Sequence, residues 1–319
     1  MTSRLFPVRA VILLTTLAVT AALAGGFFGR LHPGLDSVAH FRAHLAVMLA
    51  LCAVILLVVS FRWIALAALL FAGGALATTL SGSGFGFNRA EAALPASLDQ
   101  PVYRLVQLNL RWNHPAPDRV IDFLKKERPD IVTLEEVSPM WAGRLAALKT
   151  EYPYQLICKP NRFGSAILST RPFLGDQGCH GRDLMAGAGV DFGSTRVDIG
   201  AIHLHWPWPY TQPRQIPQLA GHVGALGQTA ILAGDFNATT WSYAVARLAE
   251  AGNLKVVDGV GPTWIDYMFP RNMRRAGLPI DHVLVKGAVE PRRAMTLEDL
   301  GSDHWPVQLE FTLATDRKT

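Results

Sequence analysis

The sequence predicts an α/β domain built around a mixed β-sheet and preceded by three transmembrane helices. Two observations carry this prediction. Three long apolar runs without a charged residue lie within the first 90 positions, and strand-like and helix-like segments alternate from residue 102 onward. Hydrophobic residues make up 50% of the 319-residue chain and charged residues only 17%, which excludes a disordered protein.

Each apolar run is close to the roughly 20 residues that an α-helix needs to cross a bilayer. A backbone within hydrocarbon must satisfy its own hydrogen bonds, so each run is expected to be helical. The first run, with Arg4 and Arg9 ahead of it, also fits a cleavable signal peptide, and the third also fits a core helix of the following domain. Because three runs follow one another, we favour a membrane region at 1–90, with spans at 10–28, 44–60 and 64–80, and a linker at 91–101.

The charge is divided unevenly along the chain. Residues 1–90 contain six basic and one acidic residue, whereas residues 91–319 contain 24 of each. A domain without net charge does not carry a general basic surface for nucleic acid, although a local cluster such as Arg271, Arg274 and Arg275 remains open.

The basic residues also predict how the spans are oriented. Arg4, Arg9 and Arg62 lie on one side of the three spans, and Arg30 and Arg42 lie on the other. The side with three arginines is expected to be cytoplasmic, because basic residues are more frequent on that side of a membrane. This predicts a cytoplasmic N-terminus in a bacterial-type inner membrane. Three spans then place residues 91–319 on the periplasmic side.

Two cysteines, Cys158 and Cys179, fall in the second part of the chain. On the periplasmic side they could form a disulfide, or they could be two separate small core residues, and the sequence leaves both open. Neither has the neighbours that a zinc site requires.

The region from residue 102 to residue 319 is expected to form one domain. Residues 102–110 alternate as a strand, and residues 117–126 have helical spacing that begins and is followed by proline. A hairpin is expected around Asn161–Gly164, which argues for a mixed rather than a purely parallel sheet. The remaining strands are expected at 130–134, 155–158, 165–170, 195–205, 229–233, 281–285 and 305–312, and the remaining helices at 138–148, 213–226 and 241–251.

Polar residues gather at the ends of these strands. Apolar neighbours such as Val132 and Ile231 surround them, so their carboxylates must be paired or must bind cations. Strand ends are also where α/β sheets place ligands. The residues concerned are Asn109, Glu136, His203, Asp235, Asn237 and the two pairs Asp281-His282 and Asp303-His304.

The residue types fit phosphoester chemistry. Asn109, Glu136 and Asp303 offer the hard oxygen ligands that suit Mg²⁺ or Mn²⁺. His304 could move a proton if a carboxylate such as Asp281 orients its ring. Asp235 and Asn237 alternate along an extended strand end and can therefore face one cleft, where one activates water and the other contacts an anion.

Seven short stretches, in this order, resemble the endonuclease/exonuclease/phosphatase superfamily of DNase-like phosphoesterases, and among them its membrane-anchored bacterial members. They span essentially the whole domain. The stretches are VQLN (106–109), LEEV (134–137), GSAILS (164–169), IHL (202–204), GDFN (234–237), IDHV (280–283) and GSDH (301–304).

The resemblance implies a two-sheet α/β sandwich with helices on the outside. It implies that Glu136 is the main metal carboxylate, with Asn109 and Asp303 nearby. It further implies that His304 is a catalytic base or acid supported by Asp281. Asp235 would orient or deprotonate water, Asn237 would bind phosphate, and His203 would contact the phosphate or the leaving group.

One position departs from the superfamily, which usually has Gln where Glu135 precedes Glu136. By alternation the two side chains should face opposite ways, and Glu136 remains the expected ligand. Trp206, in an unusual Trp-Pro-Trp-Pro loop, and Trp264 are candidates for binding a base, a sugar or a lipid. Alternatively, they cover the core. Arg214, on the next expected helix, is a further candidate for substrate binding.

These observations predict a membrane-anchored phosphoester hydrolase that depends on Mg²⁺ or Mn²⁺. The absence of net charge and the anchor favour a lipid head group or a small phosphodiester as the substrate. Nucleic acid is the alternative substrate, and a non-catalytic membrane binding protein is the alternative class. No protein partner is implied.

Overall fold

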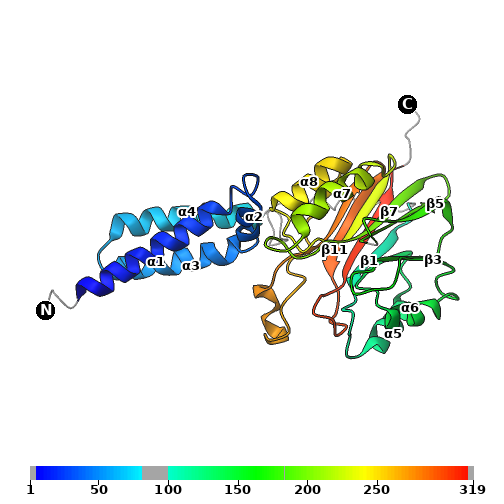
Figure 1. Cartoon of the computed structure of the whole chain (residues 1–319), viewed down its shortest axis with the longest axis horizontal. Helices are drawn as coiled ribbons and strands as arrows, with labels where there is room; N and C mark the ends of the chain where they lie inside the picture. The colour runs from blue at the N-terminus through cyan, green and yellow to red at the C-terminus, as the bar shows by residue number, and fades with distance from the viewer. Residues whose placement is uncertain (1–4, 81–99, 183, 315–319) are drawn as a thin grey trace.

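The computed structural model describes residues 5–80, 100–182 and 184–314. A helical bundle lies at one end of the molecule and a two-sheet sandwich at the other (Figure 1). This arrangement confirms the predicted α/β sandwich with apolar helices before it. The predicted linker at 91–101 falls almost entirely outside the described residues.

The bundle consists of α1 (Leu5–Gly25), α3 (Arg42–Val58) and α4 (Arg62–Leu80). Two stretches, Pro7–Gly25 and Arg62–Thr79, are long and apolar enough to cross a membrane, and a third span results if α2 (Pro33–Ala39) and α3, bent by 67°, are taken together. The third apolar run therefore packs in the bundle and is not a core helix of the sandwich.

Arg42 holds the three helices together at the end nearest the sandwich. Its guanidinium donates to the carbonyl of Gly26, just after α1, and to Thr78 Oγ1 on α4, and it stacks over Phe27. Arg9 lies beside Phe61 at the opposite end of the bundle. Among the described residues, Arg9 and Arg62 therefore lie at one end of the bundle and Arg42 at the other.

The sandwich contains two six-stranded sheets, each with parallel and antiparallel neighbours. The first sheet has the order β11-β12-β1-β2-β4-β3 and the second the order β5-β6-β7-β8-β10-β9. The strands of the first sheet are β1 (Tyr103–Asn109), β2 (Ile131–Glu135), β3 (Tyr154–Ile157), β4 (Ala166–Ser169), β11 (Val289–Thr296) and β12 (Val307–Leu313). Those of the second are β5 (Phe173–His180), β6 (Met185–Asp191), β7 (Arg196–His203), β8 (Ala230–Asp235), β9 (Lys255–Val256) and β10 (Asp281–Lys286).

Three apolar layers hold the sandwich together. Alternate residues such as Leu105 and Ile231 meet between the sheets, while their neighbours face outward against helices. The helices α5 (Pro117–Glu127) and α6 (Pro139–Ala146) cover the first sheet, and α7 (Gln212–Gly224) and α8 (Tyr243–Gly252) cover the second. A short 3₁₀ helix, η1 (Arg271–Ala276), lies on the long connection between β9 and β10.

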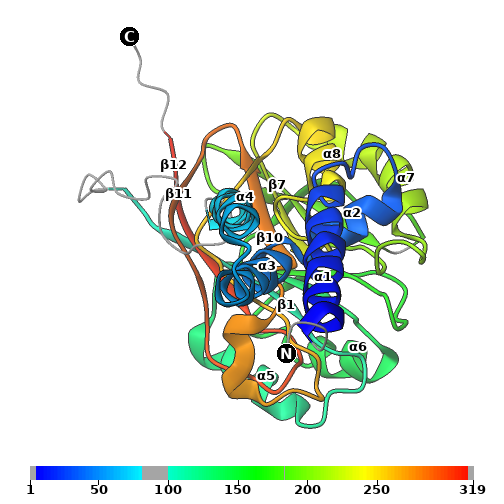
Figure 2. The same ribbon diagram turned by 90° about the vertical axis from the view of Figure 1, so that its left-hand side faces the viewer.

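The bundle docks on the sandwich through α2, which lies close to α7 and α8 (Figure 2). The carboxylate of Asp36 accepts the backbone N–H groups of Tyr243 and Ala244 at 2.6 and 3.0 Å, and so caps the start of α8. Ala39 accepts a hydrogen bond from the indole of Trp241. These contacts fix the sandwich close to one end of the bundle.

A disulfide joins Cys158 to Cys179, so the first of the two alternatives for these cysteines holds. Cys158 follows β3, at the edge of the first sheet, and Cys179 lies in β5, at the edge of the second. The bridge therefore fastens the two sheets together along one edge.

Candidate active site

Three of the expected residues lie side by side across the second sheet. β7 and β8 are parallel, and their register pairs His203 with Asp235. β10 runs antiparallel to β8 and pairs Asp281 with Asp235. Residues two positions away in each strand lie in the core between the sheets, so this row is on the inner face, at one end of the sandwich.

His304 completes the row from the opposite sheet, just before β12. Its Nδ1 lies 2.8 Å from Asp281 Oδ2, and its Nε2 lies 3.7 Å from Asp235 Oδ2. Gln107 donates to the other oxygen of Asp281 at 2.9 Å. Burial opposes the charged imidazole, but the carboxylates of Asp281 and Asp235 hold the pKa of His304 well above its usual value. Asp281 therefore orients the ring, and the two carboxylates favour its protonated form.

Glu136 approaches the row from the first sheet. β2 ends at Glu135, and Glu136 has a left-handed backbone with φ of 57°. Its carboxylate accepts the backbone N–H of Trp112 at 2.8 Å and the amide of Asn109 at 3.4 Å. Asn109 also donates to Asp235 at 3.0 Å and thus connects the two sheets. Burial raises the pKa of Glu136, so its charged form gains from a nearby cation.

Glu135 occupies a different position below the cavity. It is fully buried opposite Asn109 in the β1–β2 register and accepts a hydrogen bond from Gln107 at 2.8 Å. Burial raises its pKa well above the usual value, which favours the neutral acid. Alternation along β2 thus places Glu135, rather than Glu136, on the inner face. Glu136 reaches the cavity because the strand has ended and the backbone turns.

Asn237 also reaches the cavity through a turn, and not along an extended strand as the sequence suggested. β8 ends at Asp235, and Asn237 has a left-handed φ of 45°. Its backbone N–H donates to Asp235 Oδ1 at 2.7 Å, and its side-chain amide donates to Leu204. Gly234 is required just before, because a Cβ there would lie 1.9 Å from the carbonyl oxygen of Ile202.

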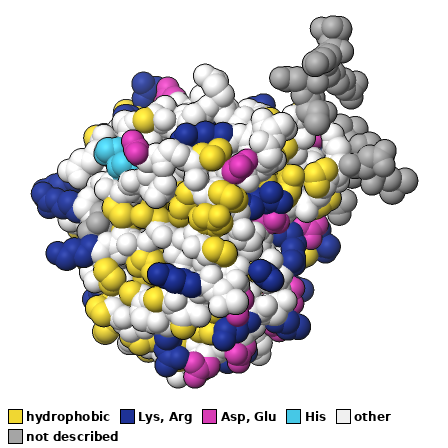
Figure 3. Space-filling view, turned by 90° about the vertical axis from the view of Figure 1, so that its right-hand side faces the viewer, with side chains coloured by type: hydrophobic (Ala, Val, Ile, Leu, Met, Phe, Trp, Pro, Cys, Tyr) yellow, Lys and Arg dark blue, Asp and Glu magenta, His cyan; other side chains and the backbone are white. Residues whose placement is uncertain are grey.

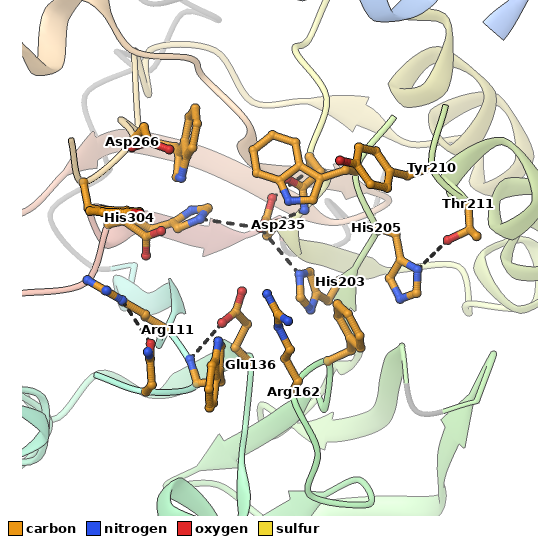
Figure 4. Close-up of a pocket in the computed structure, with 18 residues that line it drawn as sticks. Arg111, Glu136, Arg162, His203, His205, Tyr210, Thr211, Asp235, Asp266 and His304 are labelled. Carbon is orange, nitrogen blue, oxygen red and sulfur yellow. Dashed lines mark hydrogen bonds and ion pairs between the residues drawn. The ribbon is translucent and has the colours of Figure 1, made fainter. Parts of the chain in front are cut away.

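These groups surround a cavity of about 630 Å³ (Figure 4). Glu136, His203, Asp235, Asn237, Asp303 and His304 line it, whereas Asn109 and Asp281 lie behind its wall. Trp206 and Trp264 also line it and meet edge to face at 5.2 Å. Arg214 is exposed on α7 and is not part of the lining.

The cavity has further lining residues that sequence analysis did not identify. They come from loops between the strands, where no periodicity marks them. Most of these side chains are aromatic or basic, and the guanidinium of Arg162 lies over the ring of Trp112. The main ones are Arg111, Trp112, Arg162, Phe163, His205, Tyr210, Asp266 and Tyr267.

Two sets of side chains could hold a metal ion. Ligand atoms of Asp235, Asp281 and His304 lie within 4.8 Å of one another. In that set, however, Asp281 and His304 already share a hydrogen bond of 2.8 Å, which occupies both partners. The carboxylates of Glu136 and Asp303 open on the cavity and offer oxygen donors, which suit a hard divalent cation. The donor chemistry of this second set fits a metal better.

The fold is shared with several solved structures. An endonuclease/exonuclease/phosphatase from Bacteroides vulgatus is 18% identical over 67% of this chain and 100% of that chain, with a TM-score of 0.56. The 3'-5' exonuclease from Neisseria meningitidis is 19% identical over 66% and 99%, with a TM-score of 0.53. TDP2 of D. rerio, solved with a single-strand DNA product, is 17% identical over 66% and 99%, also at 0.53.

No curated protein matches the chain in sequence. The sequence model of the Endonuclease/Exonuclease/phosphatase family matches residues 106–304, which reach from β1 to His304 and include every strand of the second sheet. Because this match extends over more than half of the 319 residues, the chain belongs to the Endonuclease/Exonuclease/phosphatase family.

Proposed function

We propose that this protein is a membrane-anchored phosphoester hydrolase that depends on Mg²⁺ or Mn²⁺ and acts on the periplasmic side. Members of its family are phosphoester hydrolases that use divalent metal ions. One observation carries the proposal for this chain. His304, held from behind by Asp281, and Asp235 line the same cavity as the carboxylate of Glu136, so proton-transfer groups and an anionic cation ligand converge.

The residues at the cavity have two proposed roles, metal binding and proton transfer. Glu136 and Asp303 would hold the cation, and Asn109, expected from the sequence as a third ligand, would position Glu136 through its amide from behind the wall. When bound, that cation neutralises charge that develops on the phosphoryl oxygens. His304, oriented by Asp281, would give or take a proton at Nε2, and Asp235 would position the attacking water.

Two further side chains are suited to the phosphoryl group. Burial lowers the pKa of His203 to about 3, so the ring stays neutral at pH 7 and serves as a hydrogen-bond donor or acceptor. The side-chain amide of Asn237 donates to the carbonyl of Leu204 and to Asp235, which fixes this side chain in the wall of the cavity. We assign both to contacts with the phosphate or the leaving group.

The bundle supports the proposed location. Its three helices alternate in direction, so α1 begins at the end away from the sandwich (Figure 1). If each helix crosses the bilayer, the N-terminus and the sandwich lie on opposite sides. Arg9 and Arg62 at the far end then favour a cytoplasmic N-terminus, and the Cys158–Cys179 disulfide suits an oxidising periplasm.

The rim of the cavity favours a lipid head group or a small phosphodiester as substrate. Trp206, Tyr210 and Tyr267 are exposed by 42, 66 and 71% around the opening. Trp208, in the same loop as Trp206, accepts a hydrogen bond from Ser37 of α2. This contact holds an aromatic loop next to the end of the spans, where Trp and Tyr favour the membrane interface.

Nucleic acid is the second candidate. TDP2 of D. rerio, which shares the fold, was solved with single-strand DNA, and bases stack on aromatic rings such as those at this rim. Against it, residues 91–319 contain 24 basic and 24 acidic residues. On the face turned away from the bundle, Lys and Arg side chains are likewise scattered among hydrophobic and acidic ones (Figure 3). A duplex nuclease gains its affinity from several clustered cations.

The test uses the full chain in lipid nanodiscs or detergent, because α2 is part of the sandwich surface. Phosphomonoesters, lipid phosphodiesters in mixed vesicles and plasmid DNA are offered at matched Mg²⁺, Mn²⁺ and salt. The proposal expects metal-dependent turnover, faster on lipid or small diesters than on DNA. Rapid DNA nicking without lipid turnover would favour the nuclease, and no turnover of any ester would favour a non-catalytic binding protein.

A further inference from the structure

A second cavity, of about 520 Å³, lies between the bundle and the sandwich. One wall is the first part of α3, with Val47, Met48 and Leu51. The opposite wall is formed by residues 275–279, which run from the last turn of η1 toward β10, together with Trp241. It shares no lining residue with the catalytic cavity, and we refer to it as the junction cleft.

The junction cleft continues the outer surface of α3. Met48, Leu51, Ile55 and Val58 lie on one helix face and are exposed by 45, 61, 47 and 80%. In a bilayer this face contacts acyl chains. Leu51 is nine residues after Arg42, which corresponds to about 13 Å along the helix. The cleft therefore extends from the sandwich into the depth of the hydrocarbon.

The mouth of the cleft is basic and has no acid. No Asp or Glu occurs among its lining residues, and Arg275 is exposed there. The neighbouring Arg271 is paired with Asp299, but the described part of the chain offers Arg275 no carboxylate partner. His44 of α3 donates to the carbonyl of Ala276 at 2.7 Å, which fixes the two walls against each other beside Arg275.

We propose that the junction cleft binds one anionic phospholipid from the leaflet nearest the sandwich. One acyl chain lies along Met48 and Leu51, and the phosphate lies beside Arg275. An apolar groove open to the bilayer at one end and bounded by an unpaired cation at the other has the two features that a phospholipid requires. The inference rests on the proposed membrane insertion and is independent of the proposed hydrolysis.

Binding, and not activity, is the appropriate readout. The wall residue Leu278 exchanges backbone hydrogen bonds with Trp264, which lines the catalytic cavity. A substitution in the cleft can therefore alter turnover without any effect on a bound lipid.

The experiment reconstitutes the full chain in nanodiscs that contain a diazirine-labelled phosphatidylglycerol or phosphatidylcholine, followed by irradiation and peptide mapping. We expect the phosphatidylglycerol probe to label residues 43–51 and 275–279 preferentially. Met48→Trp fills the cleft and should reduce labelling of 275–279 at least fivefold, whereas Val54→Trp, on the exposed part of α3 outside the cleft, should not. Labelling within α1 and α4 reports membrane insertion separately.

Arg275→Gln keeps the shape of the cleft and removes the charge. It should lower the preference for phosphatidylglycerol over phosphatidylcholine about fivefold, the value of one cation near an anionic membrane surface. Arg293→Gln, exposed on β11 and outside the cleft lining, is the matched control. Equal labelling by both lipids, or labelling that Met48→Trp leaves unchanged, would overturn the proposal. So would an absence of labelling at 275–279 when α1 and α4 are labelled.

Discussion

Asp281 and His304 form a buried pair, with 2.8 Å between Oδ2 and Nδ1. Asp281 begins β10 in the second sheet, and His304 precedes β12 in the first, so the pair joins the two sheets at the floor of the cavity. Gln107 donates to the carboxylate of Asp281, and the hydroxyl of Thr263 accepts the backbone N–H of Asp281. The arrangement leaves Nε2 of His304 directed at Asp235 and available for proton transfer.

Asp281→Asn tests this relationship. The substitution preserves volume but removes the charge that orients and stabilises the imidazolium. We expect kcat to fall by about 10²–10⁴-fold, the usual contribution of a general acid or base, with a much smaller change in KM. Steady-state kinetics on the best substrate measure both. Asp176→Asn, at an exposed position of β5, is the control, and an unchanged kcat in Asp281→Asn would remove the pair from the mechanism.

Glu136→Gln and Glu135→Gln form a matched pair at neighbouring positions. Glu136→Gln removes the anionic group in the cavity, and we expect activity to fall on the order of 10²–10³-fold, with a higher metal concentration for half-activity. Burial raises the pKa of Glu135 and favours its neutral form, and Gln can accept the same hydrogen bond from Gln107. Glu135→Gln should therefore stay within about tenfold of wild type. Metal titrations of both variants check this. The reverse order of effects would assign the metal to Glu135.

The buried His282 predicts that stability falls in acid. Burial lowers its pKa from 6.5 to about 4, and its Nε2 donates to the carbonyl of Ala238. Between pH 4 and 6.5 the unfolded chain binds more protons at this histidine than the folded chain does, so protonation favours unfolding. The stability that the neutral His282 contributes is therefore complete above about pH 6.5 and is lost as the pH falls toward 4. It amounts to at most about 3 kcal/mol.

Urea unfolding of the detergent-solubilised chain at pH 7.5 and 4.5 measures this loss. His282→Gln should make the free energy of unfolding less dependent on pH, and His222→Gln, at an exposed position, should not. A wild-type pH dependence retained in His282→Gln would show that other groups cause it.

The disulfide and the three proposed spans together predict the location of the sandwich. Cys158 and Cys179 are 21 residues apart. For a loop of that length, removal of the disulfide should lower the free energy of unfolding by about 3 kcal/mol.

An alkaline phosphatase fused after Thr319 should be active, and a green fluorescent protein at the same place should be dark. Fluorescence with an inactive phosphatase would place the sandwich in the cytoplasm.

The sequence predicted those elements whose periodicity is strong. The apolar runs became α1, α3 and α4, and the strands that carry Asn109, Asp235 and Asp281 lie where they were expected. By contrast, β5, β6 and β11 were missed, because the first two are rich in glycine and the third contains Pro291 and two arginines. The short α2 was also missed, since its stability depends on docking against α8, which a sequence pattern does not reveal.

The site was predictable in its residue types and less so in its geometry. Strand ends indicated most of the polar residues that meet at the cavity. The turns that bring Glu136 and Asn237 into it are left-handed backbones of non-glycine residues, which alternation cannot predict. Arg111 and Arg162 reach the cavity from loops far apart in sequence, and only the packing of the two sheets brings them together.

The central claim is tested most directly by hydrolysis of a phosphodiester before and after removal of metal. The full chain in nanodiscs is treated with a chelator, dialysed and assayed alone, with Mg²⁺ and with Mn²⁺, alongside Glu136→Gln. The account predicts that the chelated enzyme is inactive, that Mg²⁺ or Mn²⁺ restores turnover, and that Glu136→Gln is not restored at the same concentrations. Full turnover by the chelated enzyme, or equal recovery of Glu136→Gln, would contradict it.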